Sequence, residues 1–170
     1  MIELEGHPDN VAPAYLGGFV GSIKTSNGYK TIGYPVSEDI HFTICYPNFE
    51  LETKMSRSVL PKSISISDFV FDSSRIFHLP LAFKNGDLDL LKELLNDKIH
   101  EPYRFPLIDD SDILLDFAKK HNYPICLSGS GPSILILSSK NIINELRPLN
   151  TKHNWNYLEC NVNQKGSEVN

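Results

Sequence analysis

The feature that most constrains the fold is the order in which strand-like and helix-like patterns follow one another along the 170 residues. Residues 16–46 are rich in β-branched and aromatic side chains, residues 68–120 have apolar side chains at helical spacing, and strand patterns return after residue 124. This order predicts an α+β sandwich in which antiparallel strands are covered on one face by helices.

The strand regions contain one strong turn signal. Leu16–Lys24 and Tyr29–Tyr34 flank the turn Ser26–Gly28, whose Asn-Gly step favours a β-hairpin. The tail from Gln164 onward is expected to be frayed. The other strands that the sequence predicts are Ile40–Tyr46, Ile125–Leu127, Ser133–Leu137 and Trp155–Val162.

Helical periodicity covers most of the middle of the chain. A pattern over Asp68–Lys84 is interrupted by Pro80, which should kink or split the helix. Asp87 is expected to cap a second helix, in which leucines form one stripe, and Ser111 to cap a third. A short helix is predicted at Ile142–Leu146.

Composition argues against several classes of function. A net charge of −5 and a pI near 5.6 do not suit a protein that binds nucleic acid or an anionic membrane. No apolar run approaches the roughly 20 residues of a membrane helix, and no signal peptide is visible, so a cytoplasmic location is predicted. The six histidines show no metal-ligand spacing, so no metal site is predicted.

The densest group of polar side chains lies near the N-terminus, in the string from Glu5 to Gly18. Asp9 and Asn10 are common N-cap residues, Pro13 suits a first helical turn, and the two glycines end the helix. Such a first turn presents free backbone N–H groups beside an imidazole, a carboxylate and an amide, which favours small polar ligands. Simple capping by Asp9 and Asn10 explains the same residues without a ligand.

Two arginines stand in sequence settings that suit carboxylate binding. Thr53 and Arg57 are four positions apart, so they share one face of a helical turn. Arg104 follows a turn that contains Pro102, at the end of a helical region. Two guanidinium groups can clamp one carboxylate through paired hydrogen bonds. Taken alone, each arginine is typical of a solvated surface position.

A glycine-rich loop lies between two predicted strands. Its sequence is Ser128-Gly129-Ser130-Gly131-Pro132-Ser133, and its glycines permit positive φ and a close approach to a ligand or to another loop. A glycine-rich hairpin is the plainer interpretation. The loop does not match the Gly-x-x-x-x-Gly-Lys-Ser/Thr phosphate loop and no helix follows it, so alone it does not indicate nucleotide binding.

The N-terminal string, the two arginine stretches and the glycine-rich loop follow one another along the chain as four motifs. These motifs and their order resemble those of the homoserine kinases, members of the GHMP kinase superfamily. The N-terminal string resembles a His-x-Asp-Asn-Val-Ala-Pro-Ala segment, Arg57 stands in a Thr-Lys-x-x-Arg-x-x-Leu-Pro stretch, and Arg104 ends His-Glu-Pro-Tyr-Arg. The loop resembles Leu-Ser-Gly-Ala-Gly-Pro, with Ser130 where alanine is usual. The resemblance covers nearly the whole chain. It implies a ferredoxin-like GHMP kinase C-terminal domain over residues 36–170 and a β-hairpin remnant of the N-terminal, ATP-binding domain over residues 1–35.

The resemblance also implies an activity: transfer of the γ-phosphoryl group of ATP to the side-chain hydroxyl of L-homoserine, a step in threonine biosynthesis. It implies that Arg57 and Arg104 hold the substrate carboxylate and that Thr53 supports the same wall. His7, Asp9 and Asn10 would line the pocket near the reacting hydroxyl, with Asp9 and Asn10 as the catalytic residues. The loop residues that it places near the phosphate site are Ser128, Gly129, Ser130 and Gly131.

The ATP-binding motifs of that family are missing from these 170 residues. Neither the Gly-Leu-Gly-Ser-Ser phosphate loop nor the acidic Mg²⁺ residue upstream of the His-x-Asp-Asn segment is found. ATP and Mg²⁺ are therefore expected in a complete enzyme, and this chain is expected to be a fragment, a split gene product or a truncated reading frame that is inactive alone. Its expected partner is a separate N-terminal half or a second copy.

Two other functions stay open. One is a non-catalytic module that binds homoserine or a related amino acid, and the other is a GHMP kinase for a different small alcohol. The two arginines and the His-Glu-Pro-Tyr-Arg stretch favour homoserine over a different alcohol.

Overall fold

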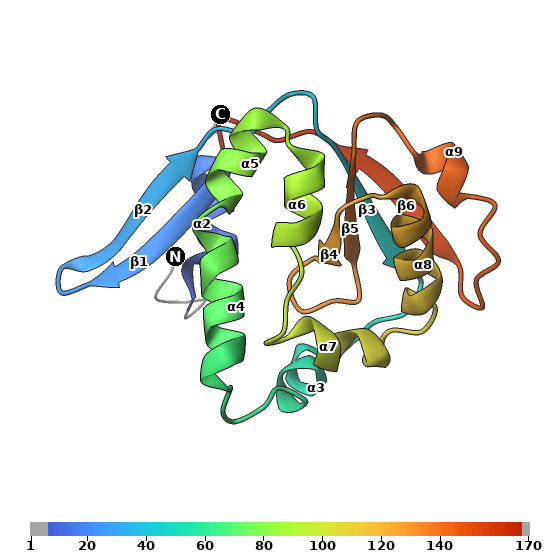
Figure 1. Cartoon of the computed structure of the whole chain (residues 1–170), viewed down its shortest axis with the longest axis horizontal. Coiled ribbons are helices and arrows are strands. Elements are labelled where there is room, and N and C mark those ends of the chain that lie inside the picture. The colour runs from blue at the N-terminus through green and yellow to red at the C-terminus, as the bar shows by residue number, and fades with distance from the viewer. Residues whose placement is uncertain (1–6, 168–170) are drawn as a thin grey trace.

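The computed structural model describes residues 7–167, which form two antiparallel sheets (Figure 1). A two-stranded hairpin projects at one side of the molecule, and a four-stranded sheet lies among the helices. The hairpin contains β1 (Phe19–Thr25) and β2 (Gly28–Tyr34). The strands of the larger sheet, in spatial order, are β4 (Ile125–Leu127), β5 (Ile134–Ser138), β3 (His41–Pro47) and β6 (Trp155–Cys160).

Most of the helices lie between β3 and β4 in the sequence. No helix within residues 7–167 combines the length and the apolar character needed to cross a membrane. A short 3₁₀ turn, η1 (Phe105–Leu107), follows α7. The α-helices are α2 (Pro8–Leu16), α3 (Thr53–Ser58), α4 (Ile66–Ile76), α5 (Leu79–Asn85), α6 (Leu88–Leu94), α7 (Glu101–Arg104), α8 (Ser111–His121) and α9 (Ile143–Leu146).

The four-stranded sheet follows the β-α-β-β-α-β order of ferredoxin-like folds. The helical segment from α3 to α8 connects β3 to the β4–β5 hairpin, and α9 connects β5 to β6. Each neighbouring pair of strands is antiparallel, and β5 and β3 occupy the centre. The expected α+β class with a ferredoxin-like antiparallel sheet is therefore confirmed.

Helices pack on both faces of this sheet, whereas the sequence analysis expects them on one. On one face of β5, Ile134 and Ile136 belong to a buried cluster with Leu114 of α8. On the other face, Leu137 belongs to a second buried cluster with Leu91 of α6. Since alternate residues of a strand point to opposite faces, a continuous apolar strand such as β5 buries both.

The hairpin at the Asn27-Gly28 step is confirmed. Thr25 pairs with Gly28 at its tip, where Gly28 has a φ of 109° that suits a residue without a Cβ atom. The first strand begins at Phe19 rather than at Leu16. The reason is that Gly17 and its neighbouring glycine both adopt positive φ and separate α2 from β1.

Pro80 splits the long helical pattern, as expected. α4 ends at Ile76, and α5 begins at Leu79 with Pro80 in its first turn, where the missing N–H costs no helical hydrogen bond. The cap of α6 is also confirmed, because the Asp87 carboxylate accepts a hydrogen bond of 2.9 Å from the amide of Leu90.

The expected cap of α8 at Ser111 is wrong. Ser111 lies inside the helix, and its hydroxyl donates to the carbonyl of Phe105. Asp110 occupies the N-cap position, but its carboxylate accepts hydrogen bonds from the amides of Lys152 and His153 instead of from its own helix. The competing partner lies 42 positions away, beyond the reach of local spacing rules.

The segment before the C-terminus packs against the end of α2 and is not frayed up to residue 167. The amide of Gly18 donates to the carbonyl of Asn163 at 2.7 Å, and the amide of Ser167 donates to the carbonyl of Tyr15 at 3.3 Å. A Cβ atom at Gly17 would lie 2.4 Å from the Asn163 carbonyl oxygen, so this close approach requires glycine. Residues 168–170 lie outside the described residues.

Candidate functional site

A buried hydrogen bond joins α3 to the glycine loop Ser128–Gly131. Ser56 in α3 is fully buried, and its hydroxyl donates to the carbonyl of Ser130 at 2.6 Å. Gly131 has a φ of 83°, and a Cβ atom there would lie 2.9 Å from the side chain of Ile108, so this position also requires glycine. Two of the four sequence motifs are thus in direct contact.

Arg104 links a third motif to the same place. It is half-buried at the end of α7, and its Nε donates to the carbonyl of Ser56 at 3.3 Å. Its Nη1 donates to the carbonyl of Gly129 at 3.4 Å and lies 3.4 Å from Nδ1 of His100. Within the described part of the chain, Nη2 has no polar partner. One side chain therefore connects α3, α7 and the glycine loop.

Asp97 determines where α7 begins. Its carboxylate accepts hydrogen bonds from the amides of Ile99, His100 and Glu101, at 3.0, 2.8 and 2.5 Å. Burial raises the pKa of Asp97, but these amides outweigh burial and the pKa is lowered. A helix of one turn is marginal by itself, so these hydrogen bonds help to hold the turn that ends at Arg104.

Thr53 and Arg57 are exposed on α3, beside this network. Neither side chain has a hydrogen-bond or ion-pair partner among residues 7–167. Arg57 directly follows Ser56, whose carbonyl binds Arg104. A guanidinium group without a partner among the described residues is available to an anion, and that role for Arg57 stays a prediction.

The N-terminal motif forms the first turn of α2, but without the expected capping. α2 begins at Pro8, and His7 in the N-cap position makes no side-chain cap. Asp9 and Asn10 lie inside the first turn, where Asp9 Oδ1 accepts from the amide of Asn10 at 3.1 Å. Pro13 lies in the helix interior rather than in its first turn. His7, Asp9 and Asn10 are all exposed.

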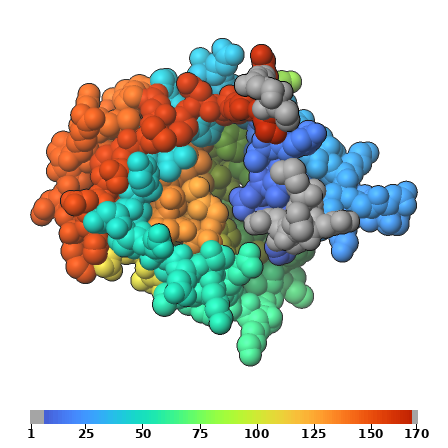
Figure 2. Space-filling model, turned by 180° about the vertical axis from the view of Figure 1, so that it is seen from behind, coloured from blue at the N-terminus to red at the C-terminus, as the bar shows by residue number. Residues whose placement is uncertain are grey.

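Figure 2 shows how this turn lies relative to the other three motifs. The blue segment that contains α2 and the orange segment around residue 130 border a hollow on this face of the molecule. The teal segment that contains α3 borders the same hollow from below. Within residues 7–167, no hydrogen bond joins α2 to α3, α7 or the glycine loop. Three motifs are therefore in contact, and the fourth lies across a hollow from them.

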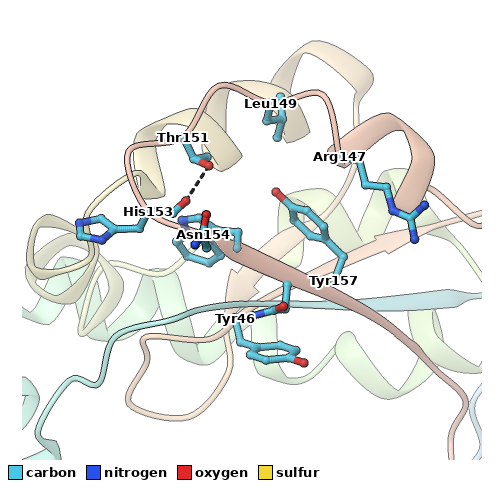
Figure 3. Close-up of a pocket in the computed structure, with 9 residues that line it drawn as sticks. Tyr46, Arg147, Leu149, Thr151, His153, Asn154 and Tyr157 are labelled. Atoms are coloured by element: carbon cyan, nitrogen blue, oxygen red, sulfur yellow. Dashed lines mark hydrogen bonds between the residues drawn. The ribbon is translucent and has the colours of Figure 1, made fainter.

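A separate polar hollow of about 480 Å³ lies beside β6 and the connection that precedes it (Figure 3). The Thr151 hydroxyl in its wall donates to the carbonyl of His153 at 2.8 Å. The guanidinium group of Arg147 points away from the Tyr157 hydroxyl in this view. None of the residues predicted for the candidate site lines this hollow, so it is distinct from that site.

Comparison with known proteins finds relatives that are named homoserine kinases. Residues 81–151 match the family model "GHMP kinases C terminal". A homoserine kinase of Clostridium botulinum strain 657 is 37% identical over 177 residues, which cover 99% of this chain and 59% of that protein. A homoserine kinase of Caldicellulosiruptor saccharolyticus is 34% identical over 98% of this chain and 57% of that protein. The crystal structure of homoserine kinase from Cytophaga hutchinsonii matches with a TM-score of 0.81 at 29% identity, over 94% of this chain and 53% of that one. The chain is a homoserine kinase homologue with a GHMP kinase C-terminal domain.

The homologue spans between 53% and 59% of the length of these three relatives. The resemblance of the chain to homoserine kinases is confirmed. The individual roles that this resemblance implies for His7, Asp9, Asn10, Thr53, Arg57, Arg104 and the glycine loop stay predictions.

Two buried residues of the network are missed by the sequence analysis. Glu101 is 8% exposed, and it lies inside the His-Glu-Pro-Tyr-Arg stretch that draws attention only to its arginine. Ser56 stands between Thr53 and Arg57, and no local signal distinguishes it from the serines around it. Glu101 could have been found from the sequence, because it is an acidic residue inside a motif that had already been singled out. Ser56 could not, because only the packing of α3 shows that it is buried.

Proposed function

We propose that this homologue supplies the substrate-binding portion of a homoserine kinase, which transfers the γ-phosphoryl group of ATP to the side-chain hydroxyl of L-homoserine. The observation that supports this most is the pair of hydrogen bonds from Arg104 to Ser56 and Gly129, which joins three of the four motifs. Relatives named homoserine kinase are 34% and 37% identical over nearly all of the chain. A cytoplasmic location without nucleic-acid or membrane partners belongs to the same proposal.

The proposed binding site of the homoserine carboxylate lies between Arg57 and Arg104. Arg57 is exposed without a partner in the described chain, and Nη2 of Arg104 is unused. Hydrogen bonds between guanidinium and carboxylate groups are about twice as strong as those between neutral groups. Thr53, one helical turn before Arg57, is proposed to form the adjoining wall.

The reacting hydroxyl is proposed to lie toward the first turn of α2, with Asp9 and Asn10 as catalytic residues and His7 beside them. The exposed Asp9 carboxylate can accept a hydrogen bond from a substrate hydroxyl, and the Asn10 amide can both donate and accept. The hydroxyl oxygen bonds to the γ-phosphorus as the bond to the ADP oxygen breaks, and the hydroxyl proton passes to the proposed acceptor, the Asp9 carboxylate. Such a transfer depends mainly on positioning and charge stabilisation, and the glycine loop is proposed to border the phosphate site.

ATP and Mg²⁺ are proposed to bind through residues outside this sequence. The Gly-Leu-Gly-Ser-Ser phosphate loop does not occur in the 170 residues. Over the described range 7–167, no group of three or more His, Cys, Asp or Glu side chains is arranged to hold a metal ion. The residues that the structure describes do not fit a Mg²⁺ site.

A fusion protein tests the proposed function. The portion of the Clostridium botulinum relative that this chain does not match would be joined to the N-terminus of the chain. We expect homoserine-dependent release of ADP in a coupled assay, because the added portion supplies the phosphate loop. An active fusion that phosphorylates another small alcohol and not homoserine would contradict the proposed substrate. A folded, inactive fusion that still binds homoserine in calorimetry would indicate a non-catalytic amino-acid-binding module instead.

An exposed apolar face on α4 supports a protein partner. Ile66, Phe69, Val70 and Phe77 are 84%, 56%, 56% and 83% exposed, at spacings that place them on one side of the helical segment. Such a stripe normally packs against a core. Because the relatives are longer than this chain, we propose that an N-terminal half covers the stripe, and that residues 1–35 are a remnant of that domain.

Without that partner, the chain is expected to self-associate through this α4 face. Replacing Phe69 and Phe77 by serine should weaken self-association at least about tenfold, since burying one such side chain contributes about 1.5–3 kcal/mol. Sedimentation equilibrium would measure the dissociation constant. The control replaces Tyr46 and Leu158, which are exposed on β3 and β6, by serine. A monomeric wild-type chain, or equal weakening in both double variants, would contradict the prediction.

A further inference from the structure

Glu101 is a buried carboxylate that contacts the strand leading into the glycine loop. It begins α7, it is 8% exposed, and its Oε1 accepts a hydrogen bond of 2.6 Å from the amide of Leu127. Leu127 ends the edge strand β4, directly before Ser128. Outward-facing amides of an edge strand have no strand partner, and a buried amide without an acceptor destabilises the fold. Glu101 supplies the acceptor that Leu127 needs.

The same short helix contacts the glycine loop a second time. Arg104, three residues after Glu101, donates to the carbonyl of Gly129. From the other helix, Ser56 donates to the carbonyl of Ser130. The hydrogen bond of Glu101 to the strand end therefore determines how α7 lies against the loop, and with it where the guanidinium group of Arg104 lies.

We propose that Glu101 is a positioning residue, which sets the register between α7 and the glycine loop by holding the amide of Leu127. The proposal rests on the proposed function, in which Arg104 binds the substrate carboxylate and the loop borders the phosphate site. Glu101 itself is not assigned a contact with substrate, so it acts through Arg104 and the loop.

The environment of Glu101 makes its titration observable. Burial raises its pKa to about 7, the hydrogen bond from Leu127 opposes this rise, and the carboxylates of Asp97 and Asp72 add to it. An ionised carboxylate accepts through either oxygen, and a protonated one still accepts through its carbonyl, so glutamine is a close mimic. Other ionisable groups on and beside the surrounding elements include Asp68, Arg75, Lys98, His100, Tyr103, Arg104 and Cys126.

The test compares Glu101→Met, which keeps the side-chain length without an acceptor, with Glu101→Gln, which keeps one. Amide hydrogen exchange at Leu127, measured by NMR on the ¹⁵N-labelled chain, is expected to be about tenfold faster in Glu101→Met and close to wild type in Glu101→Gln. In the active fusion, Glu101→Met is expected to lower kcat/KM for homoserine about tenfold at an unchanged KM for ATP. Glu101→Gln should restore kcat/KM.

The matched control is Glu93→Met, the same substitution at an exposed position of α6, which should change neither measurement. Unchanged exchange at Leu127 in Glu101→Met, or a Glu101→Gln variant as impaired as Glu101→Met, would overturn the proposal. Less folded protein with unchanged kcat/KM per folded molecule would overturn it as well, because it would make the role of Glu101 purely structural.

If Glu101→Met does not fold, the chemical shift of the Leu127 amide in the wild-type chain and in Glu101→Gln tests the proposal instead. In the wild-type chain we expect this shift to titrate with a midpoint of about 7, and in Glu101→Gln we expect the step to vanish while the His100 ring still titrates. A step that persists in Glu101→Gln would overturn the proposal. A fusion without activity would contradict the proposed function, whereas exchange and titration at Leu127 would still decide the role of Glu101.

Discussion

A polypeptide of these 170 residues is expected to release no ADP when it is given ATP, Mg²⁺ and L-homoserine. Its sequence contains no phosphate loop, and its described residues gather no metal-binding group. Phosphoryl transfer depends on such groups to stabilise charge in the transition state. Removing a single electrostatic group of this kind costs other enzymes about 10²–10³-fold in rate. Losing the phosphate loop and the metal ligands together should therefore leave no measurable turnover.

A coupled ADP assay checks this result, with the active fusion as the positive control at equal concentration. The double variant Arg57→Leu/Arg104→Leu of the 170-residue chain serves as the second control, because a contaminating kinase would be unaffected by it. The prediction would be contradicted by homoserine-dependent turnover at about 1–100 s⁻¹, the usual range of kinases, if the double variant abolishes that turnover. Such a result would mean that this chain binds ATP through residues of its own.

In the active fusion, Arg104→Leu is expected to raise KM for homoserine by about tenfold to hundredfold. The substitution removes charge-assisted hydrogen bonds to the substrate carboxylate, which contribute roughly 1.5–3 kcal/mol. KM for ATP should barely change, because the nucleotide binds to the other portion. Initial rates over a range of each substrate give the two constants.

Arg57→Leu separates carboxylate binding from local structure. Arg104 also holds the carbonyls of Ser56 and Gly129, so its loss could disturb the glycine loop. Arg57 has no such contact within the described residues, so its substitution should raise KM for homoserine without lowering the melting temperature. The double variant should be less than additive, since the two groups share one carboxylate.

The control is Arg147→Leu, an exposed arginine at the separate hollow, which should leave both KM values unchanged. Unchanged KM for homoserine in both Arg57→Leu and Arg104→Leu would show that the carboxylate clamp is wrong. The assignment of homoserine would then depend on family resemblance alone.

Local sequence patterns predicted much of the fold. The Asn27-Gly28 hairpin, the split at Pro80 and the Asp87 cap are each determined within a few residues, and each is confirmed. Two predicted caps are wrong. In one case the N-cap side chain binds a distant backbone segment instead of its own helix, and in the other the helix begins at an earlier residue than expected. Asp110 binds the backbone of a segment 42 positions away, and α2 begins at Pro8 instead of after Asn10.

By itself, the sequence indicated the resemblance to homoserine kinases and which residue types could bind a carboxylate, because motifs record chemistry in a short span. Only the tertiary structure decided which of them meet. The bonds from Ser56 to Ser130, from Leu127 to Glu101 and from Arg104 to Gly129 join residues 74, 26 and 25 positions apart. Hydrophobic periodicity indicates which face of an element is buried, but not which backbone group a buried polar side chain will bind. The packing of α3 and α7 onto the glycine loop makes that choice, since a buried donor or acceptor must find its partner where the assembled fold provides one.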